Sequence, residues 1–372
     1  MKIGCPKEIK NNENRVGITP NAAQAYIRAG HEIFIEKGAG LESAIEDNEY
    51  TKVGAKILST AAEVWKNVEM IIKVKEPLES EYNLMQANQL IYTYFHFAAN
   101  RALLDSCLKQ KIIALAYETV QEGCTLPLLK PMSEVAGRMS ALMGAFYSGR
   151  TFGGRGLLPM GVTGVAPAEV LVLGGGIVGA NAARTAAGLG CRVTILDINL
   201  ARLEYLGETL PVNVNCVYSD LVNLEHYLQT ADLVIGAVLI PGAKAPKLVK
   251  KSHLKLMKPG TVIVDVAIDQ GGCFETSHAT THNNPIFQVD SIIHYCVANM
   301  PGAYARTSTF ALVNATINYG LILANKGVEK ACRENEALKL GLNTYKGVIT
   351  FKPVAETFNL LDKYKTPESV VN

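Results

Sequence analysis

The glycine-rich segment at residues 174–179, GGGIVG, constrains the fold more than any other part of the sequence. It fits the pattern GxGxxG, which is informative only where a strand leads into it and a helix follows. The apolar run 170–173 predicts that strand, residues 180–190 predict the helix, and residues 192–196 predict a second strand. The segment therefore predicts a β-α-β unit, whose two strands run parallel because a helix crosses over between them.

An acidic residue, Asp197, ends the second predicted strand, 18 residues after Gly179. Glycines let the backbone turn tightly and approach a pyrophosphate, and the N-terminus of the helix offers free N–H groups. A carboxylate at this strand end accepts hydrogen bonds from ribose hydroxyls and repels a 2′-phosphate. The pattern predicts a dinucleotide site that prefers NAD to NADP. The alternative is a glycine turn in an ordinary β-α-β unit, with Asp197 solvated.

Predicted strands alternate with predicted helices on both sides of this segment. Strands are expected at residues 2–5, 31–36, 70–75, 89–96, 215–218, 233–238, 261–267 and 292–296. Two helices, at residues 308–325 and 328–340, and a polar tail close the chain, and the pattern does not indicate where they dock. The alternation predicts an α/β protein with parallel sheets, and 372 residues suggest two or three domains.

Composition excludes several classes of protein. Lys and Arg number 36 against 34 Asp and Glu, and these charges form no run, so nucleic-acid binding has no support. The eight cysteines form no CxxC pair, so metal-ligand spacing is absent and reduced thiols are expected. The sequence shows neither an apolar leader nor an apolar stretch long enough to cross a bilayer. We therefore expect a soluble cytoplasmic protein with no metal and no membrane partner.

Four ionisable residues are candidates for a second site. Lys75, His96 and Asp269 follow predicted parallel strands, and Arg15 lies in the loop after the first strand. The carboxyl ends of parallel strands form the crevice where α/β proteins bind ligands. A nicotinamide held by the dinucleotide site would point into such a crevice. Arginine binds a carboxylate in bidentate fashion, lysine holds a neighbouring carbonyl oxygen, and histidine exchanges protons near neutral pH. With an aspartate to orient water, the set suits hydride removal from a small amino or hydroxy acid.

Each of these residues also has an ordinary structural interpretation. Lys75 could be a solvated lysine, because Lys73 on the same run shows that lysines occur there without special cause. His96, between two phenylalanines, could be a hydrogen-bonded core residue. Asp269 could cap the following glycine turn, and Arg15 could be surface charge.

Blocks spread over almost the whole chain resemble the alanine dehydrogenase and pyridine nucleotide transhydrogenase family. They lie at residues 7–20, 73–77, 132–137, 242–246, 265–272 and 296–301. The Arg15 segment and residues 73–77 also resemble the NAD-binding subunit of proton-translocating transhydrogenase, whereas the His96 segment and residues 267–272 are closer to alanine dehydrogenase. Three consecutive glycines at 174–176 depart from the Gly-Ala-Gly of many members, and we attach no meaning to this.

The resemblance implies reversible, NAD-dependent oxidative deamination of L-alanine to pyruvate and ammonium. It assigns substrate binding to Arg15 and Lys75, and catalysis to His96 and Asp269, and it leaves open which of the last two activates water. The cofactor contacts that it implies are Ser133, Gly174, Gly176, Ile177, Val178, Gly179, Asp197, Arg202, Ser219, Val238, Leu239, Val266, Ala267, Ile268, Asp269, Ala298, Asn299, Met300 and Pro301.

The resemblance further implies two Rossmann-like domains in a homohexamer. An NAD-binding domain with a doubly wound parallel sheet would span residues 130–307. A discontinuous substrate domain would join residues 1–129 to a helical C-terminal segment at 308–372.

Two other functions remain open at this point. A transhydrogenase NAD-binding subunit would exchange hydride between nucleotides, beside a membrane partner, without turning over alanine. A catalytically silent NAD-responsive protein would keep the Asp197 loop, but it would not need Lys75, His96 and Asp269.

Overall fold

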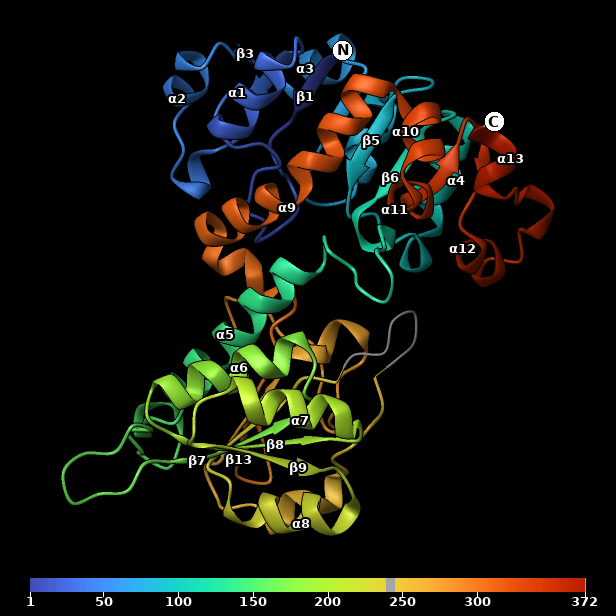
Figure 1. The fold of residues 1–372 in the computed structure, drawn as a ribbon. Helices are drawn as coiled ribbons and strands as arrows, with labels where there is room; N and C mark the ends of the chain where they lie inside the picture. Colours follow the sequence, from blue (N-terminus) through green and yellow to red (C-terminus); the bar gives the residue numbers. More distant parts are fainter. Residues whose placement is uncertain (239–244, 372) are drawn as a thin grey trace. The chain divides into compact units, whose positions relative to one another are not determined.

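The computed structural model describes residues 1–238 and 245–371, which form two compact units (Figure 1). The first unit combines Met1–Met132 with the chain from Gly302 onward, and the second comprises Ser133–Pro301. Each unit is built on one sheet, and both sheets are mainly parallel. The predicted α/β class with Rossmann-like sheets is confirmed.

The first unit has an eight-stranded sheet in the order β15-β14-β6-β5-β4-β1-β2-β3. Its strands are β1 (Lys2–Cys5), β2 (Glu32–Glu36), β3 (Lys56–Leu58), β4 (Met70–Ile72), β5 (Leu90–Thr93), β6 (Ile113–Ala116), β14 (Leu342–Tyr345) and β15 (Val348–Ile349). Strands β1 to β6 pair in parallel, whereas β14 pairs antiparallel with β6 and β15 antiparallel with β14. The carboxyl ends of β5, β4 and β1 therefore lie side by side.

Helices from both ends of the chain cover this sheet. They are α1 (Pro20–Arg28), α2 (Asp47–Lys52), α3 (Ala61–Asn67), α4 (Arg101–Lys109), α9 (Ala305–Lys326), α10 (Val328–Glu334), α11 (Glu336–Gly341), α12 (Lys352–Thr357) and α13 (Pro367–Val371). The long helix α9 docks on the N-terminal part: Tyr92 donates to the Thr316 carbonyl, and a β-carbon on Gly320 would overlap the Tyr26 hydroxyl (Figure 1). This contact decides where the C-terminal helices pack.

The second unit has a seven-stranded sheet in the order β12-β13-β11-β10-β7-β8-β9. Its strands are β7 (Glu169–Leu173), β8 (Arg192–Asp197), β9 (Val214–Tyr218), β10 (Leu233–Gly236), β11 (Val262–Asp265), β12 (Ile286–Val289) and β13 (Ile292–Tyr295), and its helices are α5 (Lys130–Tyr147), α6 (Ile177–Gly188), α7 (Leu200–Thr209) and α8 (Leu221–Thr230). All pairs are parallel except β12–β13. The order runs outward from β7 in both directions, so the sheet is doubly wound with its switch point between β7 and β10.

Alternate side chains of β7 pack into two different cores, because successive residues of a strand point to opposite faces. Val170 and Val172 join the core that contains the alanines of α6. Leu171 and Leu173 join the opposite core, together with Leu224 of α8. This apolar run therefore forms a central strand that is buried on both faces.

Some predicted elements are wrong in extent. The strands expected at 70–75 and 89–96 end at Ile72 and Thr93. The expected polar tail instead supplies β14, β15 and two short helices. The strand β14 was not predicted because of its polar residues. Thr344 donates a hydrogen bond to the Ile112 carbonyl and Asn343 donates one to Thr119, so these polar side chains have partners although they are buried. None of the helices in the described ranges is long and apolar enough to span a membrane.

Candidate active site

The glycine loop of the second unit joins β7 to α6 with little space for side chains. Gly174 has a φ of +97°, which favours glycine. A β-carbon on Gly179 would overlap the Gly174 carbonyl oxygen, so the first turn of α6 packs directly against the loop. A β-carbon on Gly176 would meet nothing within 4 Å. The loop therefore leaves an open approach beside a helix N-terminus, which fits the pyrophosphate of a dinucleotide.

Asp197 ties this loop to the end of β8. Its Oδ2 accepts a hydrogen bond from the Gly175 N–H at 2.6 Å, and its Oδ1 accepts one from Asn199 at 2.8 Å. Arg202 donates from Nε to the Gly175 carbonyl at 2.7 Å. The carboxylate is half-buried and has lone pairs beyond these two bonds, so it can still accept a ribose hydroxyl.

The other proposed cofactor residues mostly follow neighbouring strands of the same sheet. Ser219 follows β9, Val238 follows β10, residues 266–269 follow β11 and residues 298–301 follow β13. Because these strands are parallel, the residues lie at one edge with the glycine loop. Ser133 lies instead on α5, one turn before Gly137, where a β-carbon would overlap the Val178 carbonyl. Leu239 lies outside the described residues.

Asp269 lies on a short turn of helix, Val266–Gln270, that returns sharply at Gly271 and Gly272, both with positive φ. Buried Asp265 closes the loop, because it accepts hydrogen bonds from the amides of Cys273 and Phe274 at 3.2 and 3.4 Å. Lys247 donates to the carbonyls of Gly271 and Phe274. Burial raises the pKa of Asp265. The Asp269 carboxylate itself is exposed.

In the first unit, Arg15 is buried against Glu13. Its Nε lies 2.6 Å from Glu13 Oε1, its Nη2 lies 2.5 Å from Oε2, and its Nη1 lies 2.8 Å from the Met132 sulfur. This bidentate pair is not the surface charge that the sequence allows as an alternative. Sequence reasoning missed Glu13, whose one signal is its position two residues before Arg15.

Lys75 lies three residues beyond β4 and is half-buried. Within the described part of the chain, no hydrogen bond or ion pair engages its ammonium group. Its pKa is lowered, first by burial and then by the positive charge of Arg15. Glu13 and Glu76 oppose this lowering from a distance. Among the described residues Lys75 is therefore a cation with no directly paired carboxylate, and a substrate carboxylate could supply one.

His96 lies three residues beyond β5 in the left-handed region, with a φ of +49°. Glu118 holds this strained turn, because its carboxylate accepts hydrogen bonds from the Phe95 and His96 amides. The imidazole is exposed and stacks on the Tyr94 ring, with centroids 5.9 Å apart. The side chain is therefore presented to solvent, unlike a core histidine.

The structure brings three of the four candidates to one place. Arg15, Lys75 and His96 follow β1, β4 and β5, which are neighbours in the first sheet. Asp269 instead lies at the carboxyl edge of the second sheet. The four residues thus belong to two sheet edges, one in each unit.

The two units together define an α/β protein with one doubly wound, dinucleotide-binding type of sheet and one sheet with a cationic edge. The chain belongs to the alanine dehydrogenase/PNT family: the N-terminal domain model of this family matches residues 4–136 and the C-terminal domain model matches residues 140–352.

Known relatives match along the full chain. It is 54% identical to an alanine dehydrogenase of Methanococcus maripaludis and 51% identical to alanine dehydrogenase 2 of Staphylococcus aureus, with 100% of each chain covered. A solved L-alanine dehydrogenase superposes with a TM-score of 0.94 at 47% identity, over 96% of this chain and 99% of that one. A transhydrogenase from Sinorhizobium meliloti, at 24% identity and a TM-score of 0.82 over 94% of this chain and 99% of that one, shares the fold.

Proposed function

We propose that this protein is an L-alanine dehydrogenase that converts L-alanine, NAD and water reversibly to pyruvate, ammonium and NADH. The observation that carries the proposal is the end-to-end identity of 51–54% with curated alanine dehydrogenases. The Lys75 ammonium supports it, because the substrate carboxylate needs a cation and no described residue forms an ion pair with this one.

In this proposal the first unit binds the substrate. Lys75 pairs with the alanine carboxylate, and Arg15 adds guanidinium charge beside it. The Glu13 contact orients the Arg15 guanidinium, because it fixes Nε and Nη2 of the rigid planar group.

The second unit would hold NAD, which supplies an acceptor for the substrate hydride when it is bound. The loop at 174–179 would approach the pyrophosphate, and Asp197 would accept the ribose hydroxyls. The remaining proposed contacts are Ser133, Arg202, Ser219, Val238, Leu239, residues 266–269 and residues 298–301.

His96 and Asp269 are the proposed proton carriers. The exposed imidazole of His96 can take a proton from the amino group or from the attacking water, and it can return one to the departing ammonia. The exposed carboxylate of Asp269 can orient the water or take its proton. Either residue can activate the water on these grounds.

An absorbance assay tests the activity. Purified protein with L-alanine and NAD should form NADH, and protein with pyruvate, ammonium and NADH should consume it. Hydride exchange between two nucleotides without alanine turnover would instead favour the transhydrogenase subunit, and NAD binding without either reaction would favour a silent regulatory protein.

The Asp197 carboxylate is expected to set cofactor preference. In Asp197→Asn the amide oxygen can still accept the Gly175 N–H, but the negative charge that repels a 2′-phosphate is lost. We expect the ratio of kcat/KM for NAD over NADP to fall about tenfold or more, the equivalent of about 1.4 kcal/mol.

The matched control is Asp290→Asn. Asp290 is an exposed residue of the same unit with a φ of +48°, a conformation that asparagine tolerates well. This variant removes the same charge away from the cofactor edge and should keep the wild-type ratio. An unchanged ratio in Asp197→Asn would remove the proposed role.

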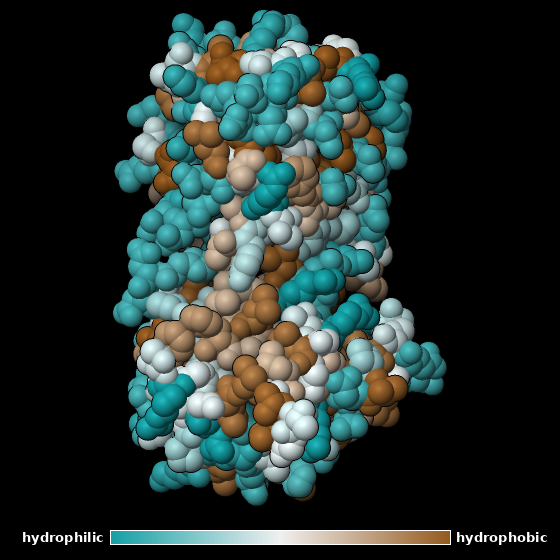
Figure 2. Space-filling model, turned by 90° about the vertical axis from the view of Figure 1, so that its left-hand side faces the viewer, coloured by the Kyte–Doolittle hydropathy of each residue, from teal (hydrophilic) through white to brown (hydrophobic). Residues whose placement is uncertain are grey.

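We also propose a cytoplasmic homohexamer. Apolar side chains are exposed in the second unit on the segment 157–167, namely Leu158, Met160, Val162 and Val165. Figure 2 shows apolar side chains gathered over the second unit on one face of the molecule. Exposed apolar patches of this kind favour association between subunits, and light scattering would give the mass of the assembly. All eight cysteines are free, which fits a reducing compartment.

A further inference from the structure

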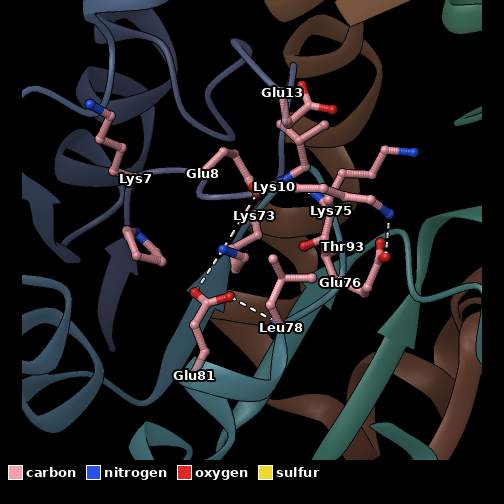
Figure 3. A network of polar contacts seen from close by, with 12 residues as sticks. Lys7, Glu8, Lys10, Glu13, Lys73, Lys75, Glu76, Leu78, Glu81 and Thr93 are labelled. Carbon is pink, nitrogen blue, oxygen red and sulfur yellow. Dashed lines mark hydrogen bonds and ion pairs between the residues drawn. The ribbon is translucent and has the colours of Figure 1, made fainter. Parts of the chain in front are cut away.

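A buried network of charges lies beneath Lys75 (Figure 3). The Lys73 ammonium is completely buried, 2.8 Å from Glu81 Oε1 and 3.4 Å from Glu8 Oε2. Glu8 and Glu81 are also buried. Glu8 comes from the loop after β1, Lys73 from the residue after β4, and Glu81 from the 3-10 helix Glu79–Leu84. Three segments that are separate in the sequence therefore converge on one ammonium group.

The second oxygen of Glu8 binds the backbone that carries Lys75. Glu8 Oε1 accepts hydrogen bonds from the amides of Val74 at 2.6 Å and Lys75 at 3.3 Å. From the other side, Thr93 Oγ1 donates to the Lys75 carbonyl at 3.0 Å, and the Tyr94 amide donates to the Val74 carbonyl at 3.3 Å. Polar partners thus hold both peptide groups of this irregular segment.

This arrangement is costly if its only role is stability. Two carboxylates and one ammonium are removed from water, and an apolar cluster of similar volume is often as stable as such a group. Burial raises the pKa of Glu8, while Lys73 opposes that rise and so favours the charged acceptor. Lys75, two residues from Lys73, makes no hydrogen bond or ion pair through its ammonium among the described residues, and Glu13 and Glu76 act on it only from a distance. The two carboxylates of the network therefore pair with the Lys73 ammonium, whereas the Lys75 ammonium can still pair with a bound carboxylate.

We propose that Glu8, held by Lys73, is a positioning residue for Lys75. By accepting the Val74 and Lys75 amides, it fixes the direction in which the Lys75 side chain leaves the backbone. It thereby orders the ammonium before the substrate carboxylate arrives, which lowers the entropy cost of binding. The proposal rests on the proposed function, because it requires that Lys75 binds the carboxylate of L-alanine or pyruvate.

A double-mutant cycle between Glu8 and Lys75 tests the proposal. Glu8→Ala should raise the KM for L-alanine and for pyruvate about tenfold, the cost expected for a misplaced binding group, and leave the KM for NAD within about twofold. Lys75→Ala should raise the substrate KM further. In the Lys75→Ala background, removal of Glu8 should add less than about threefold, because Glu8 acts through Lys75.

A conservative variant and a distant control separate positioning from general damage. Glu8→Gln keeps an oxygen acceptor for the two amides, so its substrate KM should lie closer to wild type than that of Glu8→Ala. Lys56→Ala removes an exposed lysine that pairs with Glu32 on β2 of the same sheet, and it should change no kinetic constant. Thermal unfolding checks that each variant is folded. If Glu8→Ala does not fold, the cycle is run with Glu8→Gln, whose loss of charge should still raise the substrate KM measurably.

Three outcomes overturn the proposal. The first is an unchanged substrate KM in folded Glu8 variants, and the second is an equal rise in the KM for NAD and for substrate. The third is a double mutant whose rise in substrate KM equals the product of the rises in the two single mutants. Absence of alanine turnover in the wild-type protein would instead overturn the proposed function. The two failures are therefore distinguishable.

Discussion

Replacing His96 by alanine is expected to lower the rate of NADH formation from L-alanine about a thousandfold, within the range for loss of a general acid–base group. The side chain is exposed, so the variant should fold, with only the small loss of stability expected for alanine at a φ of +49°. Asp269→Asn keeps the shape of the side chain and removes its charge, and we expect a loss of similar size. Steady-state assays in both directions, with the KM for NAD unchanged in His96→Ala, would locate the defect of that variant in proton transfer.

His226→Ala is the matched control for this prediction. His226 is an exposed histidine on α8 of the second unit, so its removal should leave the rate unchanged. A normal rate in folded His96→Ala or Asp269→Asn would exclude that residue from catalysis.

Gly179→Ala should have the largest effect on the second unit. The new methyl group would overlap the Gly174 carbonyl, and its two nearest neighbours are backbone atoms of Gly174 that cannot turn aside as a flexible side chain could. We expect the free energy of unfolding of this unit to fall by about 3 kcal/mol, and NAD binding to weaken because the loop must move away from α6. Denaturant unfolding and calorimetric titration with NAD measure the two effects.

Gly188→Ala provides the control within the same helix. Gly188 is exposed, and a β-carbon there meets nothing within 4 Å. Alanine should therefore stabilise α6 by about 0.5–1 kcal/mol through its higher helix propensity and leave NAD binding unchanged. Similar behaviour of the two variants would contradict the close-packing explanation.

The glycine loop could be predicted from the sequence because all of its determinants are local. Strand, turn, helix and the acidic residue lie within residues 170–197, and the structure places the Gly175 amide on Asp197. The alternation of strands and helices likewise predicts the α/β class, since each element is a short local pattern. The same reasoning extended the strand at 70–75 too far, because β-rich residues there continue past Ile72, the last residue of β4 that pairs with β5.

The two neighbouring lysines show what the sequence could not predict. Lys73 and Lys75 look equivalent in the run KVKEP, where the pattern offers no reason to expect a special role for Lys73. In the structure Lys73 is buried between Glu8 and Glu81, whereas Lys75 has no counterion in the described ranges. The distinction depends on carboxylates contributed by other segments, one of them 65 positions away from Lys73.

The sequence by itself therefore determined the class of fold, the strand–loop–helix unit of a dinucleotide-binding site and the list of candidate site residues. It could do so because hydrophobic periodicity and turn chemistry act over a few residues. Only the tertiary structure decided that β14 extends the N-terminal sheet and that α9 packs against it. It also decided that Arg15 pairs with Glu13, and that Lys75 has no ion pair among the described residues. These outcomes depend on contacts between distant segments, and burial turns such contacts into strong electrostatic constraints.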